Sequence, residues 1–228
     1  MTTFEHAIFA INGCLAAGLQ KRYDWNLVAM AAVCAVLPDW DGLTLIGGAA
    51  LFDQAHRAWG HNLLACVLMG AACGVCDYRF HLTGRAACWL VRRLQSPSHG
   101  AVHHGNDTHE QTSGDEDCSA VARQRSRTPS GYIVWATVGV LAALSHLAAD
   151  LVFSGGAGLS DWELRLGWPF SDRGFVYPLV PWGDVGVTAI FVIGMFAMLR
   201  WRKRTSSIAG ATLAAAVLYA ILRGTISL

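Results

Sequence analysis

The stretch YIVWATVGVLAALSHLAADLVF, residues 132–153, decides the fold of this chain. A helix that crosses a membrane needs about 20 consecutive apolar residues, and this segment alone meets that length. Within it, the only Asp, Glu, Lys or Arg is Asp150, which follows His146 by one helical turn. The segment therefore predicts a transmembrane helix that carries two ionisable side chains on one face.

The rest of the composition points the same way. Hydrophobic residues make up 54% of the 228 residues and charged residues only 14%, whereas soluble domains are close to a quarter charged. We therefore expect an all-α protein, a polytopic transmembrane helical bundle of about five to six helices with a polar lid segment. The net charge of +1 gives no sign of a nucleic-acid partner. The further apolar segments are 7–19, 27–37 with a broken continuation through 43–52, 61–75, 185–199 and 208–222.

The pattern divides the chain into four parts. Residues 1–95 hold the N-terminal membrane helices, residues 131–184 the His146–Asp150 helix with an extracytoplasmic lid, and residues 185–228 the C-terminal helices. Residues 96–130 are polar and poor in apolar side chains, so we interpret them as a disordered loop. Its four histidines are interpreted as solvated side chains rather than metal ligands: His99, His103, His104 and His109.

Most of the 17 basic residues fall into four clusters between the apolar segments. Because cytoplasmic loops collect Lys and Arg, we place all four clusters inside. The N-terminus, residues 38–60 and residues 154–183 then lie outside. This predicts a multi-pass protein of the cytoplasmic (inner) membrane, with membrane lipid as a partner and the oligomeric state left open. The clusters are Lys21 and Arg22; Arg79, Arg85, Arg92 and Arg93; Arg123, Arg125 and Arg127; and Arg200, Arg202, Lys203 and Arg204.

Unexpected polar residues gather at the predicted outer ends of the segments. Ionisable groups at membrane depth are costly, so they usually face a cavity, pair with one another or bind something. Imidazoles and carboxylates from several elements suit zinc, manganese or iron. The alternatives are a helix stop and N-cap at LPDWDG and contacts of His56 and Arg57 with lipid headgroups. The set is Glu5, His6, Asp39, Asp41, His56, Arg57, His61, His146 and Asp150.

The order of these motifs resembles the YdjM-like family of inner-membrane proteins described as metal-dependent hydrolases. The motifs are an N-terminal His6, LPDWD at 37–41, HRAWGHNL at 56–63, HLAADLVFSGG at 146–156 and WPFSDRGF at 168–175. A weaker similarity links them to zinc-dependent phospholipase C. The sequence departs from the family pattern at Glu5, where Thr is usual, and at Gly60-His61-Asn62, where Thr-His-Ser is usual.

The resemblance implies a metal site built from His6, Asp39, His56 or His61, His146 and Asp150. We therefore expect a hydrolase that binds a divalent metal, zinc in the first place and manganese or iron as alternatives, and acts on a lipid-like or phosphoester substrate at the outer membrane face. Asp41 or His56 is expected to act as general base. Arg57 or Arg173 is expected to stabilise an anionic intermediate. The alternative is a non-catalytic membrane protein whose cluster is a structural metal or partner-docking site.

Overall fold

The computed structural model describes residues 1–95, 128–154 and 163–227, and these parts are mainly helical apart from the irregular segment 163–184. Within them no β-strand occurs, and the only β-pairing is an isolated bridge between Leu164 and Phe175. The all-α prediction is confirmed. The elements are α1 (Thr3–Ala16), α2 (Leu19–Arg22), α3 (Trp25–Val36), the 3-10 helix η1 (Leu37–Gly47), α4 (Ala49–Ala55), α5 (Leu63–Phe80), α6 (Leu82–Gln95), α8 (Pro129–Val152), α9 (Val185–Arg200), η2 (Arg202–Arg204) and α10 (Thr205–Ser227).

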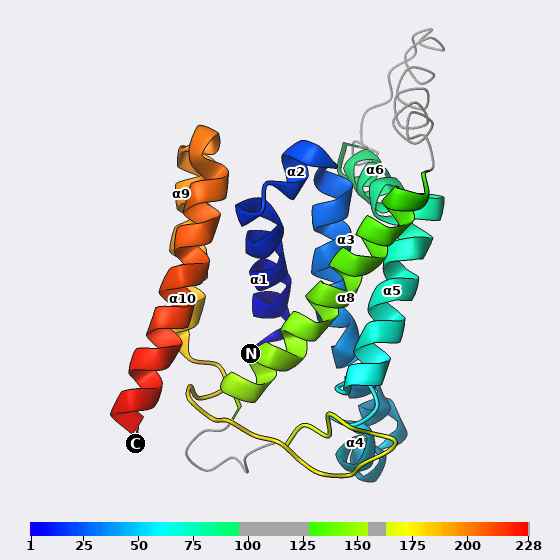
Figure 1. The fold of residues 1–228 in the computed structure, drawn as a ribbon, viewed down its shortest axis with the longest axis vertical. Coiled ribbons are helices and arrows are strands. Elements are labelled where there is room, and N and C mark those ends of the chain that lie inside the picture. Colours follow the sequence, from blue (N-terminus) through cyan, green and yellow to red (C-terminus); the bar gives the residue numbers. More distant parts are fainter. Residues whose placement is uncertain (96–127, 155–162, 228) are drawn as a thin grey trace, which may run out of the picture.

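Four stretches of helix are long and apolar enough to cross a membrane: Trp25–Gly47, Leu63–Phe80, Pro129–Val152 and Arg202–Thr225. The helix α9 is apolar but shorter. These helices run along the long axis of the molecule, with α1 packed among them (Figure 1). The predicted disordered loop at 96–130 falls mostly on residues 96–127, which lie outside the described residues, and α8 begins directly after them, at Pro129.

Glycines allow α5 and α8 to pack closely. A Cβ added at Gly70 would lie 2.6 Å from the carbonyl oxygen of Gly139, and a Cβ at Gly139 would clash with the Gly70 carbonyl. Gly74, one turn further along α5, faces the backbone of Trp135 in the same way. Small residues spaced by four let helix backbones approach each other in lipid, where no hydrophobic effect drives helices together. The crossing therefore fixes how α5 and α8 are placed relative to each other.

The LPDWDG motif lies in a 3-10 helix. The chain leaves α3 without a break and continues as η1, which ends at Gly48 with φ of +105°. Pro38 stands in the first turn of η1, and its missing N–H cannot continue the hydrogen-bond pattern of α3. Because a 3-10 helix has about three residues per turn, Asp39 and Asp41 leave it in different directions.

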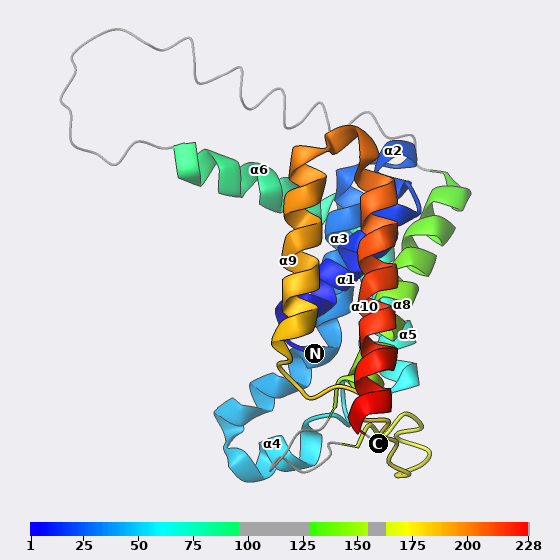
Figure 2. The ribbon, with the colours of Figure 1, turned by 90° about the vertical axis from the view of Figure 1, so that its left-hand side faces the viewer.

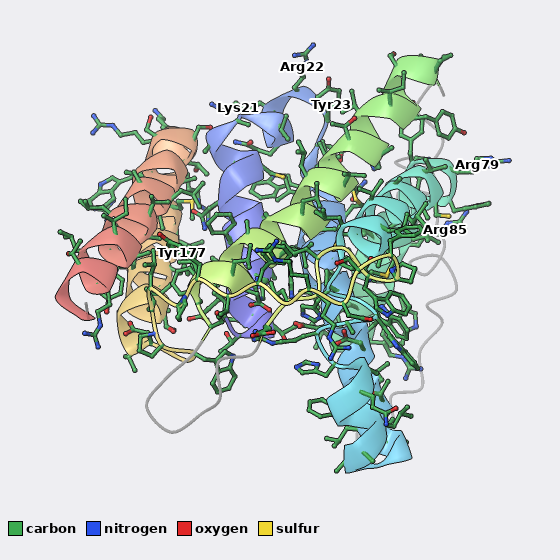
Figure 3. All side chains as sticks on the ribbon, turned by 60° about the horizontal axis from the view of Figure 1, so that its bottom comes forward. Lys21, Arg22, Tyr23, Arg79, Arg85 and Tyr177 are labelled. Carbon is green, nitrogen blue, oxygen red and sulfur yellow. The ribbon has the colours of Figure 1, made fainter. Side chains whose placement is uncertain are left out.

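The two ends of the bundle differ in their side chains. The helix α2, the start of α6 and the turn from α9 to α10 lie at one end, and α6 extends sideways from the bundle (Figures 1 and 2). We call this the basic end; Lys21, Arg22, Arg79 and Arg85 are exposed there (Figure 3). At the opposite end lie η1, α4, the start of α5 and the end of α8 (Figure 1). The Arg123–Arg127 cluster lies outside the described residues.

Candidate metal centre

Four side-chain atoms converge where η1, the start of α5 and the end of α8 meet. His61 Nε2 lies 3.0 Å from His146 Nε2, and both atoms lie 3.5 Å from Asp150 Oδ2. Asp39 Oδ1 lies 3.5 Å from His61 Nε2 and 3.4 Å from His146 Nε2. His61, His146 and Asp150 are almost fully buried, and Asp39 is 26% exposed at its side chain.

Five of the six distances between these four atoms are short enough for ligands of one metal ion, and the ligand atoms of Asp39, His61 and His146 all lie within 4.8 Å of one another. Zinc binds imidazole nitrogen and carboxylate oxygen at about 2.0–2.2 Å, so neighbouring ligands of a regular tetrahedron lie about 3.3–3.6 Å apart. Four of the five distances above are 3.4–3.5 Å, and the fifth, between the imidazoles, is 3.0 Å. The donor set of two imidazoles and two carboxylates also suits zinc, manganese or iron. We call these four residues the cage.

Each of the two cage imidazoles has a hydrogen-bond partner at its Nδ1 atom. His146 Nδ1 lies 2.7 Å from the carbonyl oxygen of Ala35 in α3, which can only accept a proton, so Nδ1 donates. His61 Nδ1 lies 2.9 Å from Asp41 Oδ2. A neutral ring that donates through Nδ1 carries a lone pair on Nε2, and here the two lone pairs would face each other. A cation bound by both nitrogens would remove that repulsion. Hydrogen bonds of the other ring nitrogen, like those of Nδ1 here, are typical of metal-binding histidines.

Asp41 orients the segment that carries His61. Its side chain is fully buried and accepts backbone N–H groups of Arg57 and Gly60, each at 3.1 Å. It also lies 3.1 Å from His56 Nδ1. Gly60 is required because a Cβ there would clash with the Pro38 carbonyl, and Arg57 takes a left-handed conformation with φ of +60°. Residues 56–61 are thus wrapped directly around η1.

A second layer surrounds the cage carboxylates. His6 Nε2 lies 3.0 Å from Asp150 Oδ1, and its ring stacks on His146 with centroids 3.7 Å apart. The Met1 amino group is 2.9 Å from the same Oδ1. Thr3 donates its hydroxyl to Asp39 Oδ2 at 2.7 Å. His6 Nδ1 is buried without a hydrogen-bond partner, so His6, with His146 and Asp150, forms a second group that could hold a metal ion.

The charge balance of the cage calls for a cation. Burial alone lowers the pKa of His61, but hydrogen bonds to the carboxylates, that of Asp150 first, outweigh burial and raise the pKa to about 10. A positive charge at His61 Nε2 is therefore favoured, whether a proton or a metal ion carries it. Arg57 adds a further cation, with its guanidinium 3.7 Å from Asp150 Oδ2.

The cage opens into a cavity of about 450 Å³, which we call the polar cavity. Asp39, His56, Arg57, His61 and Asp150 line it together with residues of the N-terminus and Trp182. Thus eight predicted site residues meet here: His6, Asp39, Asp41, His56, Arg57, His61, His146 and Asp150.

The predicted lid contributes differently from expectation. Arg173 is exposed, lies over the ring of Phe175 and is not among the residues that line the polar cavity. Phe170 is 86% exposed. Trp182 was not predicted; it borders the cavity and donates its indole N–H to the Met1 carbonyl at 3.2 Å. Residues 155–162 of the predicted lid lie outside the described residues.

A bundle of membrane-length helices with buried His and Asp groups able to hold a metal ion defines the class: an integral membrane protein with a candidate metal centre. Over residues 1–227 the chain matches the family model described as YdjM inner membrane protein, so it belongs to that family. The predicted family is thereby confirmed. The searches of curated proteins and of solved structures returned no match.

Proposed function

We propose that the protein is a metal-dependent hydrolase of the inner membrane that cleaves a phosphoester or acyl ester bond of a lipid-like substrate at the extracytoplasmic face. The observation that carries the proposal is the cage, in which a carboxylate oxygen of Asp39 and one of Asp150 each lie 3.4–3.5 Å from two buried imidazole nitrogens. Zinc is the first candidate, with manganese or iron as alternatives. The open polar cavity beside the cage gives a substrate access.

The residues divide into holding, orienting and reacting groups. Asp39, His61, His146 and Asp150 hold the ion, which when bound supplies Lewis acidity to water and to the scissile group. Asp41 is assigned a positioning role, because four donors already occupy its two oxygens.

His56 is the better candidate for general base. Its Nδ1 faces Asp41 Oδ1 at 3.1 Å, and its side chain is 21% exposed and lines the polar cavity. With Nδ1 donating to the carboxylate, Nε2 is the basic nitrogen of the neutral ring. Arg57, also in the lining, is positioned to bind a phosphate or a developing oxyanion.

One observation favours a second candidate function. If all four cage residues bound one zinc ion, the site would be closed, as is typical of structural zinc, whereas catalytic zinc keeps a position for water or substrate. A structural metal that ties η1, α5 and α8 together is therefore the alternative. The catalytic proposal requires that one carboxylate yields its position or that the ion accepts a fifth ligand.

Elemental analysis of the detergent-purified protein, paired with hydrolysis assays on a panel of lipid phosphoesters and esters, tests the proposal. Wild type is expected to carry about one metal ion per chain and to turn over at least one panel member. Asp150→Asn is expected to lose both, while Asp172→Asn, which changes an exposed acid, keeps both. Bound metal with no turnover on the panel would favour the structural role, and absence of metal from wild type would refute both functions.

A further inference from the structure

A second cavity lies beside the metal centre, and its lining is almost entirely apolar. It has a volume of about 220 Å³ and lies between α8, α9 and α10, with Met1 and Phe9 at its N-terminal side. Among the described residues that line it, only Ser145 has a polar side chain, and its hydroxyl donates to the Ala142 carbonyl at 2.7 Å. Apolar cavities of about 150 Å³ already stay dry and bind hydrocarbons. We call this cavity the apolar groove.

Small side chains create the apolar groove. Ala148 and Ala149 of α8 face Ala216 and Ala220 of α10 across it, and Phe191 of α9 lies at its wall. Ala149, Ala216, Ala220 and Phe191 are themselves buried, so the space is left because these alanines are too short to fill it. Water would find no hydrogen-bond partner there, whereas a chain of methylene groups would contact apolar atoms along the lining.

The apolar groove adjoins the polar cavity. Met1 lines both, and its amino group lies 2.9 Å from Asp150 Oδ1. On α8, Ala149 lines the groove while the next residue, Asp150, lines the polar cavity. The two cavities together thus present an apolar compartment and a compartment with Arg57 and the candidate metal cage. That combination is complementary to a molecule with one hydrocarbon chain and an anionic head.

We propose that the apolar groove binds one hydrocarbon chain of a membrane lipid and so directs the phosphate or ester group of that lipid into the polar cavity. The placing of the head group rests on the proposed function, whereas the binding of the chain does not. The substrate class is then an anionic lipid that has one hydrocarbon chain, or one of whose chains enters the groove alone. Selection would come from two sources: the length of chain that the groove accepts and the charge that Arg57 meets.

Native mass spectrometry of the full chain in detergent tests this with 1-oleoyl lysophosphatidic acid, which carries one chain and a phosphate monoester. Ala216→Trp fills the groove and is expected to reduce the lipid-bound fraction about tenfold, because an overpacked site cannot admit the chain. Ala215→Trp is the matched control, since the neighbouring Ala215 is exposed and does not line the groove, and it is expected to bind like wild type. Ala220→Leu, a milder filling of the same groove, is measured in parallel.

Metal content measured on the same samples separates the two proposals. Lipid lost in Ala216→Trp with metal retained supports the groove. If wild type holds no metal but Ala216→Trp and Ala220→Leu still lose lipid while remaining monodisperse and helical, the proposed function fails and the groove stands. If both groove variants bind lipid as wild type does, the groove proposal is overturned whatever the metal content. Should Ala216→Trp not fold, Ala220→Leu against Ala215→Trp decides in the same way.

Discussion

The two ends of the bundle both carry polar residues but differ in how these are placed. At the basic end, Lys21, Arg22 and Arg79 are exposed. At the metal centre, His61, His146 and Asp150 are buried and lie within 3.5 Å of one another. Exposed cations at a membrane boundary are explained by solvation, because water and lipid headgroups can surround them. Buried ionisable groups gathered around one point are not, and those at this end could hold a metal ion.

Burial by itself does not make this distinction. Asp77 near the basic end is 2% exposed, yet it accepts hydrogen bonds from the Thr83 backbone at 2.7 Å and from the Trp135 indole at 3.2 Å. Its partners are neutral donors that satisfy it, so Asp77 is a structural residue that joins α5, α6 and α8. The cage differs because two buried imidazole nitrogens lie 3.0 Å apart and each lies 3.4–3.5 Å from two carboxylate oxygens.

Removing both cage imidazoles is expected to have the largest effect. His61→Ala combined with His146→Ala deletes two of four ligands, and we expect metal affinity to fall more than about 100-fold, beyond the loss that neighbouring groups alone cause. Lys21→Ala combined with Arg22→Ala, two exposed residues of the basic end, is the control and should retain full metal content. Elemental analysis after dialysis measures both. Equal metal in the two double variants would contradict the assignment of the cage.

Asp41→Asn is expected to give the next largest effect. The amide cannot serve His61 and His56 as a carboxylate does, and loss of such an orienting partner typically lowers metal affinity about 10–100-fold. Competition with a metal-chelating dye measures the affinity. Asp77→Asn changes a buried acid of the other region and should lower thermal stability without changing the affinity. A similar loss of affinity in both variants would mean that general destabilisation, rather than His61 orientation, is responsible.

Much of the fold could be predicted because apolar length is a local property. The segment 132–153 becomes α8 at 129–152, and each of the other predicted apolar segments is helical over most of its length. The spacing of His146 and Asp150 also predicted their shared face, because i and i+4 positions on a helix lie one turn apart. The sequence left open whether His56 or His61 belongs to the candidate metal site. Both flank the start of α5, and the left-handed Arg57 between them decides which one faces His146.

Three features had no usable signal in the sequence. The Ala35 carbonyl that orients His146 is a backbone group, and any residue would supply it. Thr3 and Trp182 reach the site only because the chain brings the N-terminus and the segment before α9 together. Arg173 illustrates the opposite error: its motif neighbours suggested a place in the site, but its side chain lies on the surface beside Phe175.

Gly70→Ala tests the close packing of α5 against α8, which lies away from both ends of the bundle. A methyl group there meets the Gly139 backbone at 2.6 Å, and overpacking of this kind costs about 1–3 kcal/mol. We expect a lower melting temperature in detergent. Gly13→Ala is the matched control, because a Cβ at that position of α1 has no atom within 4 Å, and it should be neutral or stabilising by about 0.5–1 kcal/mol. A Gly70→Ala protein as stable as Gly13→Ala would disprove the tight crossing.

Thr3→Val is expected to have the smallest effect. It removes the hydroxyl that donates to Asp39 Oδ2 in an exposed position, a loss of about 0.5–1.5 kcal/mol, and should weaken metal binding only a few-fold. Thr205→Val, at the basic end, removes an exposed hydroxyl that donates to the Arg202 carbonyl and should leave the affinity unchanged. Titration of the metal-free proteins measures the difference. A larger loss for Thr205→Val than for Thr3→Val would reverse the contrast between the ends.

The spread of the cage along the chain has a consequence for biogenesis. Asp39 and His61 are synthesised long before His146 and Asp150, so the first helices enter the bilayer with half of the cage missing. Helices in membranes insert first and associate afterwards. The four groups can meet only when α8 has docked against α3 and α5. Capture of an ion would then mark the completion of assembly, and a nascent chain halted before residue 146 would have no complete cage to load.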